Sequence, residues 1–282
     1  MAELTDQLSR EEHLRILREL IIPDERLNLA GSHERPKAII LGGQPGAGKG
    51  GLESIAKKEL LNDVISIDPD ALRVYHPAVD RFRSENPLDW SSRTHADAAA
   101  WADEALDAVS SAKKNLIFDT TLSNGEWAAD SLIRDLQTRG YEVEVRVVAA
   151  HKLESEIGVD KRFTDGIDSQ GFGRHVPKAA RDAIYEKTPR SLEYIQANTD
   201  VVIRISNREG MQLYDSRTDP RAAGQALEEE RTNRLREPKV TQSLSSTSRA
   251  QADWHQQLSH PPFLIWSRRL GKCWPSSRMR RV

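Results

Sequence analysis

The chain has 282 residues, of which 38% are hydrophobic and 30% charged, and its formal net charge is −2. This length and composition allow one α/β core of about 200 residues plus an appendage, while a single cysteine, Cys273, excludes an internal disulfide framework. No stretch approaches the ~20 consecutive apolar residues that span a bilayer, and the charged N-terminus lacks a signal-peptide core, so we expect a cytoplasmic protein without membrane contact.

An amphipathic helix is predicted near the N-terminus, over residues 5–29. Ser9 and Glu12 have the spacing of a capping box at its start. We expect this helix either to pack on the main domain or, as the sharper alternative, to bind a partner. A loop over residues 31–36 completes an N-terminal segment, residues 1–36. The apolar stripe of the helix consists of Leu8, Leu14, Ile16, Leu17, Leu20 and Ile21.

A strand and a turn over residues 37–49 carry the strongest motif in the chain. Such a glycine-rich turn lies between a buried parallel strand and a helix N-terminus. Its backbone N–H groups converge on one phosphate, while its lysine brings positive charge to the outer phosphates. The motif therefore predicts a triphosphate nucleotide as ligand and a helix over residues 49–61. The residues that fit G-x-x-x-x-G-K are Gly43, Gln44, Pro45, Gly46, Ala47, Gly48 and Lys49.

The two residues after the lysine depart from this motif. A Ser or Thr would place a hydroxyl on Mg²⁺, but the chain has Gly50 followed by Gly51. The metal must then find another protein ligand, be held by water and phosphate, or be missing. Two early glycines also weaken the start of the helix, by up to ~1 kcal/mol each relative to alanine.

A second strand is predicted over residues 64–67, and it ends at Asp68-Pro69-Asp70. Open parallel sheets bind ligands beyond the carboxyl ends of their strands, so a carboxylate here is positioned for chemistry. We expect Asp70 to be a general base. For Asp68 the alternative is that its side chain caps the turn, because Asp before Pro favours turn initiation. For either carboxylate, a purely structural role is an equal alternative.

A third strand, over residues 115–119, follows an alanine-rich helix that contains Glu104. The strand ends at Asp119, which is the pattern of the second nucleotide-site motif of P-loop proteins, whose carboxylate contacts Mg²⁺ or its water. Thr120 and Thr121 come next. They are candidate hydroxyl ligands, with the alternative that they cap the next helix.

A glycine-rich segment over residues 165–174 follows a strand over 141–150 and a helix over 151–165. We expect this segment to be flexible, and Arg162 and Arg174 bracket it. Phosphoryl transfer spreads negative charge over the transferred group, and a cationic lid can neutralise that charge while excluding water. Two arginines on a charged chain more often belong to a solvated face, but the nearby phosphate loop favours a lid.

The remaining segments complete the predicted sheet. A helix over residues 178–197, interrupted near Pro189, leads to a fifth strand over 201–205, and a charged helix over 221–236 follows. Only residues 71–92 show little periodicity. Five strands with intervening helices predict a mainly parallel sheet covered on both faces, the three-layer α/β fold of P-loop kinases.

Residues 238–282 differ chemically from the rest. They contain eight Lys or Arg and a single acidic residue, a net charge of about +7. Trp254, Trp266 and Trp274 lie among serines, prolines and these basic residues. Such a mixture would suit stacking on single-stranded nucleic acid, but we favour an irregular tail, or one that docks on the domain through its tryptophans.

Several separated motifs together resemble the zeta toxins. The resemblance implies a P-loop kinase over residues 37–237 that uses ATP and Mg²⁺ to phosphorylate the 3′-hydroxyl of the sugar in UDP-N-acetylglucosamine, which poisons a cell-wall precursor. It also implies a small helical antitoxin protein that obstructs the ATP site. The matching features are the phosphate loop, Asp68 and Asp70 followed by His76-Pro77, Asp119 with Thr121, Arg162 with Arg174, and Asn207-Arg208-Glu209-Gly210.

The resemblance also implies residue roles. Lys49 would bind phosphate, Asp70 would take the proton of the sugar hydroxyl, and Arg162 and Arg174 would stabilise the transferred charge. It places Glu104, Asp119 and Thr121 around the sugar and the metal, with Asp119 as the metal ligand. It adds Gly50 and Gly51 to the nucleotide site and places Asn207 and Arg208 near the nucleotide base.

Three positions depart from the family pattern: Gly50 replaces the hydroxyl residue, Asp119 stands where Glu is common, and Ser123 stands where many members have Arg. Losing one metal ligand would raise the barrier by about 2–4 kcal/mol, or slow the reaction by about 10²–10³, if oxyanion-hole deletions are a guide. Two other functions therefore stay open. One is nucleotide binding with little turnover; the other is a nucleotide or polynucleotide kinase, whose binding would fall steeply with salt.

Overall fold

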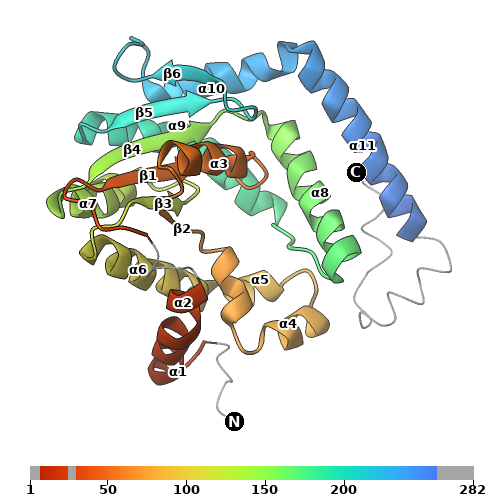
Figure 1. Ribbon diagram of the computed structural model, residues 1–282. Helices are drawn as coiled ribbons and strands as arrows, with labels where there is room; N and C mark the ends of the chain where they lie inside the picture. Colours follow the sequence, from red (N-terminus) through yellow and green to blue (C-terminus); the bar gives the residue numbers. More distant parts are fainter. Residues whose placement is uncertain (1–6, 25–29, 259–282) are drawn as a thin grey trace.

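The computed structural model describes residues 7–24 and 30–258 (Figure 1). Its centre is a six-stranded sheet in the order β2-β3-β1-β4-β5-β6. Five strands pair in parallel, and β6 pairs antiparallel with β5. The mainly parallel α/β fold is therefore confirmed, with one more edge strand than the five predicted. The strands are β1 (Lys37–Gly42), β2 (Ile65–Ile67), β3 (Leu116–Asp119), β4 (Glu142–Val148), β5 (Val202–Ser206) and β6 (Gln212–Asp215).

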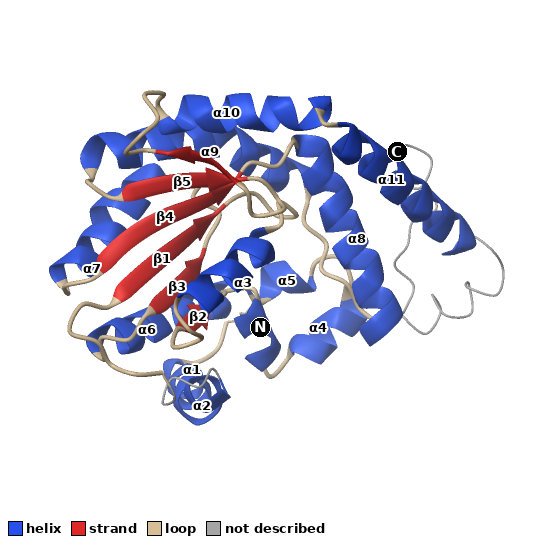
Figure 2. Cartoon of the chain, turned by 45° about the horizontal axis from the view of Figure 1, so that its top comes forward, coloured by secondary structure: helices blue, strands red, loops and turns tan. Residues whose placement is uncertain are grey.

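Helices cover both faces of the sheet and give the protein three layers (Figures 1 and 2). Ala38 and Ile40 of β1 belong to the larger core, whereas Ile39 and Leu41 face α3. A strand buried on both faces reads as a continuous apolar run, which is why β1 is recognisable in the sequence. The larger core is closed by α6 (His95–Ser111), η3 (Trp127–Ile133), α7 (Arg134–Thr138) and α9 (Lys178–Asn198), and the smaller one by α3 (Lys49–Glu59).

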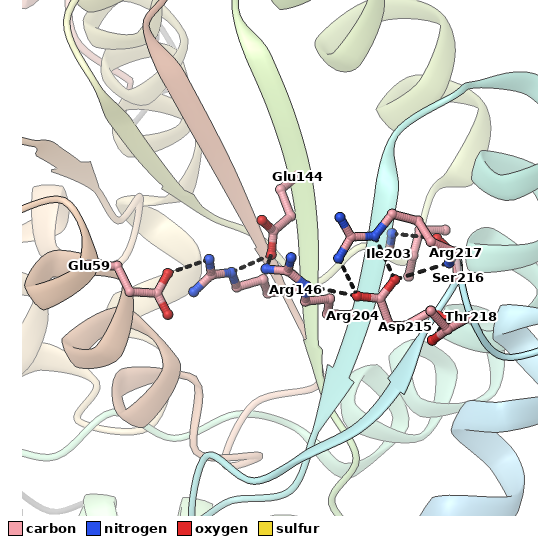
Figure 3. Close-up of polar contacts among 9 residues, drawn as sticks. All are labelled: Glu59, Glu144, Arg146, Ile203, Arg204, Asp215, Ser216, Arg217 and Thr218. Carbon is pink, nitrogen blue, oxygen red and sulfur yellow. Dashed lines mark hydrogen bonds and ion pairs between the residues drawn. The ribbon is translucent and has the colours of Figure 1, made fainter.

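Ion pairs lie over β4, β5 and β6, on the same face of the sheet as α3 (Figure 3). Alternate residues of β4 point to opposite faces, so Val143, Val145 and Val147 enter the larger core while Glu144 and Arg146 lie on the other side. Arg146 pairs with Glu59 of α3 and with Glu144, both at 2.6 Å. Arg204 continues the run, 2.7 Å from Glu144 and 3.2 Å from Asp215. These ion pairs compensate one another's charges on this face of the sheet.

The N-terminal helical segment packs on the main domain, which was one of the two alternatives expected for it. It comprises α1 (Arg10–Ile16), η1 (Leu17–Ile21) and α2 (Ile22–Asp24). The hydroxyl of Ser9 accepts the N–H of Glu12 at 3.3 Å, as the predicted cap requires. Its buried side chains, Ile16, Leu17 and Ile21, join the larger core. The predicted span of 5–29 includes residues that lie outside the described part of the chain.

Two regions are more helical than predicted. The stretch of low periodicity forms η2 (Ala71–Tyr75), α4 (Val79–Glu85) and α5 (Trp90–Arg93). The predicted flexible lid over 165–174 was wrong in most of its length, because α8 (Lys152–Gln170) continues through Gly166. One glycine costs a helix only about 1 kcal/mol, and Phe163 and Ile167 bury against neighbours on either side of it. Gly171, with a φ of 81°, ends the helix instead.

The helix α9 passes through Pro189 without the predicted interruption. A proline inside a helix removes the hydrogen bond to the carbonyl four residues earlier, here that of Tyr185. That carbonyl accepts from Arg231 of α10 at 2.9 Å instead. A tertiary contact that the local sequence does not reveal therefore compensates for the proline.

The predicted irregular tail begins with a helix. After α10 (Ala223–Asn233) and η4 (Arg234–Arg236), α11 (Pro238–Leu258) runs along α8 (Figure 1). Trp254 donates to Asp168 of α8 at 2.9 Å, in agreement with docking through a tryptophan. Trp266, Trp274 and Cys273 lie outside the described residues. No helix in the described part of the chain combines the length and the apolar content needed to cross a membrane.

Candidate active site

The phosphate loop connects β1 to α3 at the carboxyl edge of the parallel sheet. Gly43, Gly46 and Gly48 have φ values of 141°, 80° and 98°, in the left-handed region that glycine adopts at little cost. Gly46 has a second constraint, because an added Cβ would overlap the carbonyl oxygen of Ser155 in α8. The loop thus lies tightly between sheet and α8, and it leads into a helix N-terminus that favours an anion.

Lys49 is joined to the end of β3. Its ammonium nitrogen lies 2.6 Å from Oδ1 of Asp119 and donates to the carbonyl of Thr120 at 2.9 Å. The pairing of β1 with β3 sets this contact, because Leu41 is in register with Asp119. The predicted lysine and the predicted metal ligand therefore meet, and a phosphate that reaches Lys49 would compete with Asp119 for its ammonium group.

Two half-buried carboxylates face the positive charges of the site. Burial raises the pKa of Asp68 above its ordinary value, and the charges of Lys49, Arg162 and Arg174 oppose this increase. Burial also raises the pKa of Asp119, which Lys49 opposes and the charge of Asp68 reinforces. The ends of β2 and β3 and the helix α8 thus bring these five groups within electrostatic reach of one another.

Asp70 is held between two guanidinium groups. Its Oδ1 accepts from Nε of Arg73 at 3.1 Å, and its Oδ2 pairs with Nη1 of Arg174. Asp68 closes the turn that presents it, because Oδ1 of Asp68 accepts the N–H of Asp70 at 2.8 Å, which agrees with its expected role as a turn cap. Proton acceptance by Asp70 requires that one guanidinium turns to another anion, such as a phosphate.

The segment that carries Arg174 is anchored rather than loose. Trp90 donates to the carbonyl of Gly173 at 3.0 Å, and the guanidinium of Arg83 lies 3.5 Å from the ring centre of Phe172. Nε of Arg174 is buried and has no hydrogen-bond partner among the described residues. Arg174 therefore keeps one donor for an incoming anion. Arg162 lies on the exposed side of α8, without such an anchor.

Glu104 makes its contacts with the N-terminal helix. Its Oε2 lies 3.1 Å from Nε2 of His13, and its Oε1 pairs with Arg10. His13 is itself buried and contacts Asp97 at 3.0 Å. These contacts hold the N-terminal helix against α6, and they do not support the predicted position of Glu104 beside the sugar and Asp119.

The two threonines after β3 shape a sharp turn. Thr120 Oγ1 accepts the N–H of Leu122 at 3.1 Å, and Leu122 has a φ of 49°, a conformation that bulky residues rarely adopt. The hydroxyl of Thr121 lies 2.9 Å from that of Ser123. The expected alternative, a cap for the next helix, was wrong, because Asn124 caps it. Thr121 and Ser123 therefore place two hydroxyl groups in the turn that follows Asp119.

Arg208 lies beside the phosphate loop. It belongs to the turn between β5 and β6 and donates to the carbonyl of Glu154 at 2.9 Å, while a Cβ added at Gly48 would lie 3.3 Å from its Nε. Asn207 closes the same turn, because its Oδ1 accepts the N–H of Met211 at 2.8 Å. Arg208 is thus available to a nucleotide, and Asn207 positions it.

A buried brace behind the loop was not predicted. Gln44 is 1% exposed, donates to Oγ of Ser155 at 2.7 Å and accepts from Nη2 of Arg231 at 2.8 Å. Arg231 is also 1% exposed, and its guanidinium lies 4.0 Å from the ring centre of Tyr185. No local signal marks this arginine, because it lies in a charged helix where exposure is the default.

The strand-end carboxylates suit a magnesium ion held mainly by phosphate and water. Among residues 7–24 and 30–258, no group of three or more His, Cys, Asp or Glu side chains could hold a metal. Mg²⁺ usually takes one or two carboxylates and completes its shell with phosphates and water. Asp119 and Asp68 supply that number. At Gly50 an added Cβ would meet no atom within 4 Å, so a hydroxyl ligand would fit there.

The fold and the site together define a P-loop phosphotransferase. A family model described as zeta toxin matches residues 24–219. The toxin zeta of Streptococcus pyogenes is 30% identical over 203 residues, which cover 71% of this chain and 70% of that protein. The toxin PezT of Streptococcus pneumoniae is 28% identical over 202 residues, which cover 70% and 79%. The chain belongs to the zeta-toxin family, whose members are toxin kinases.

A solved structure supports the same fold. It comes from the study of the PezAT chromosomal toxin–antitoxin system of Streptococcus pneumoniae, and it matches with a TM-score of 0.74 at 22% identity. The match covers 88% of this chain and 99% of the other. It therefore extends beyond residue 219, where the family model ends.

Proposed function

We propose that this protein is an ATP-dependent kinase that phosphorylates the 3′-hydroxyl of the sugar in UDP-N-acetylglucosamine or a related nucleotide-linked sugar. The observation that carries the proposal is that two ion pairs, Lys49 with Asp119 and Arg174 with Asp70, lie at the carboxyl edge of the sheet. The charges of Lys49 and Arg174 both act on Asp68, which links the two pairs. Membership of the zeta-toxin family supports the donor and the acceptor class. Such a product would impair cell-wall synthesis, and the cytoplasm, where nucleotide-linked sugars and ATP are available, is the proposed place of action.

In the proposed step, Asp70, Lys49 and Arg174 each have one role. The sugar hydroxyl gives its proton to the carboxylate of Asp70 while its oxygen forms a bond to the γ-phosphorus. The bond from that phosphorus to the β–γ bridging oxygen breaks, and ADP leaves. Lys49 and the loop N–H groups hold the donor, and Arg174 turns from Asp70 to the transferred group. Mg²⁺, bound by Asp119 and the phosphates, would neutralise charge on the donor.

An acceptor panel tests this function directly. The purified protein is incubated with ATP, Mg²⁺ and one acceptor at a time, namely UDP-N-acetylglucosamine, UDP, free N-acetylglucosamine or an oligonucleotide. We expect ADP release that depends on the nucleotide-linked sugar, and phosphorus NMR should place the new phosphate on the 3′-oxygen. The kinase assignment fails if no acceptor stimulates ADP release from the protein or from its Gly50→Ser variant.

A second function, nucleotide binding with little turnover, is favoured by one observation. Gly50 leaves the position of the metal-binding hydroxyl without a side chain. Such a protein would bind an ATP analogue but show no acceptor-dependent ADP release. The comparison of Gly50→Ser with Gly50→Ala, described in the Discussion, separates it from a slow kinase.

We also propose that a small helical antitoxin protein binds this chain. The support is that a structure from a toxin–antitoxin system shares its fold. Expression of the chain alone should arrest growth, and the Asp70→Asn variant should not. Recovery of a tagged chain from its native cells without a stoichiometric small protein would contradict the proposed partner.

A further inference from the structure

A cavity of about 540 Å³ lies beside the phosphate loop, between α8, the β5–β6 turn and α11. Two of its lining residues touch the loop. An added Cβ at Gly158 would lie 2.7 Å from the carbonyl oxygen of Gly46, and Arg208 lies against Gly48. The volume is in the usual range for small-molecule sites. A nucleotide with its phosphates on the loop would therefore have this cavity next to its nucleoside.

The charges at the base of the cavity are already neutralised. Arg234 is 1% exposed and lies 2.9 Å from Glu154, 3.1 Å from Glu209 and 3.0 Å from Glu237. These contacts leave Arg234 no need of an anionic ligand. Arg234 is therefore not a free cation waiting for a further phosphate.

The other lining groups suit a flat, uncharged ring. Ile157 of α8 and Val240 and Leu244 of α11 offer apolar surface. Ser243 and three cationic residues, Arg208, Lys161 and Lys239, lie among them. Small-molecule sites commonly combine an apolar lining with a few polar groups that fix orientation. This combination fits the base of a nucleotide better than a sugar or a phosphate.

The outer wall of the cavity comes from α11, which lies beyond the family-matched residues 24–219. Val240, Ser243, Leu244 and Thr247 line the cavity from this helix. Three polar contacts hold α11 on α8. The hydroxyl of Thr164 donates to Gln251 at 3.0 Å, Trp254 donates to Asp168 at 2.9 Å, and Nε2 of His255 lies 3.1 Å from Oδ1 of Asp160. These contacts hold the second half of α11 against residues 160–168 of α8.

Resting on the proposed use of a nucleoside triphosphate, we propose that α11 closes the pocket for the donor's base and that Val240, Ser243 and Leu244 determine which base is accepted. The phosphate loop then holds the common part of every nucleotide, and α11 recognises the part that differs. Selectivity for adenine over other bases would arise outside the residues that define the family.

Two ligands separate the contribution of the phosphate loop from that of α11. A non-hydrolysable ATP analogue carries a base, and inorganic tripolyphosphate carries only the phosphates; both affinities are measured by titration calorimetry on the full chain. Ser243→Trp places a ring in the cavity, and we expect it to lower affinity for the analogue about tenfold or more while tripolyphosphate binding changes less than about twofold. Ser245→Trp is the matched control, because Ser245 is exposed and about 200° further around the helix. It should change neither affinity.

Equal analogue affinities for the two tryptophan variants would overturn the proposal, as would a wild-type protein that binds the analogue no better than tripolyphosphate. If Ser243→Trp unfolds, Leu244→Ala decides: the proposal requires a selective loss of analogue binding of about fivefold, and no loss overturns it. The kinase assignment is tested separately. Selective base binding without acceptor-dependent ADP release would leave this inference intact and contradict only the proposed reaction.

Discussion

The carboxylate of Asp70 pairs with the guanidinium of Arg174, which lies 104 residues later in the chain. The pair joins the end of β2 to the segment after α8. The proposed base and the proposed phosphoryl-binding arginine are therefore paired with each other and not free for substrate. Both groups must separate before the reaction, Arg174 towards the transferred phosphoryl group and Asp70 towards the acceptor hydroxyl. The two residues are therefore expected to act as one unit.

This coupling predicts non-additive kinetics. Asp70→Asn should lower kcat about 10²–10⁴-fold, as loss of a general base does, and Arg174→Ala should lower it about 10³-fold or more. The double variant should be far less impaired than the product of the two losses. Steady-state ADP release measures all three, and Asp135→Asn, an exposed carboxylate on α7, is the control. Full additivity would show that the two residues act independently.

Gly50→Ser should accelerate turnover. The added side chain meets no atom within 4 Å, so it fits, and its hydroxyl would restore a metal ligand worth about 10²–10³ in rate. Gly50→Ala adds the same helix-stabilising Cβ without the hydroxyl. Rates are compared over a Mg²⁺ titration. If serine and alanine give the same rate, the missing hydroxyl does not limit this protein.

Arg231→Met should weaken both the fold and the phosphate loop. It leaves the buried oxygens of Gln44 and Tyr185 without their donor, a cost of about 1–3 kcal/mol in the free energy of unfolding per buried group. We expect weaker tripolyphosphate binding as well, because Gln44 belongs to the loop. Urea unfolding and calorimetry measure the two effects. The exposed Arg236→Met is the control, and an unchanged affinity in Arg231→Met would show that the brace does not shape the loop.

Acid should loosen the start of α8 through His151. Its Nδ1 accepts the N–H of Leu153 at 3.2 Å, so the cap needs the neutral ring, and burial lowers the pKa of His151 below 6.5. Since this pKa is lower in the folded than in the unfolded chain, the contribution is present above pH 6.5 and is lost as pH falls through the folded pKa. His151→Asn keeps a capping side chain that does not titrate. The stability difference between the two proteins, about 1 kcal/mol at most, should change between pH 7.5 and pH 5.

Glu104→Gln should affect stability rather than catalysis. The glutamate holds His13 and Arg10 of the N-terminal helix, so its neutralisation should lower the free energy of unfolding by about 1 kcal/mol. We expect kcat to stay near the wild-type value. A loss of turnover comparable to that of Asp70→Asn would instead restore Glu104 to the substrate site.

Local patterns predicted the parts of the site that lie on strands. A continuous apolar run followed by glycines indicates β1 and its loop, and the acids that end β2 and β3 follow from the rule that ligands bind beyond parallel strand ends. The pairing of Lys49 with Asp119 is a consequence of strand order. The loop and the acids at the strand ends depend on residues that are close in sequence.

Contacts between distant residues could not be predicted in the same way. The burial of Arg231 depends on a proline in α9 that frees a carbonyl 46 residues away, and the position of Glu104 depends on the docking of α1. The helix α11 is hidden in a serine-rich sequence whose sparse stripe, Val240, Leu244 and Thr247, has meaning only against α8. In each case tertiary packing, and not local propensity, decided the outcome.

The hydrogen bond between Gln44 and Arg231 spans 187 positions of the chain. Synthesis proceeds from the N-terminus, and early segments leave the ribosome first, so every residue of the phosphate-binding motif is exposed to the cell long before its brace exists. A nascent or prematurely terminated polypeptide would carry the whole motif and still lack the arginine that holds it. For a member of a toxin family, this order of assembly would delay the braced form of the loop until Arg231 has been synthesised.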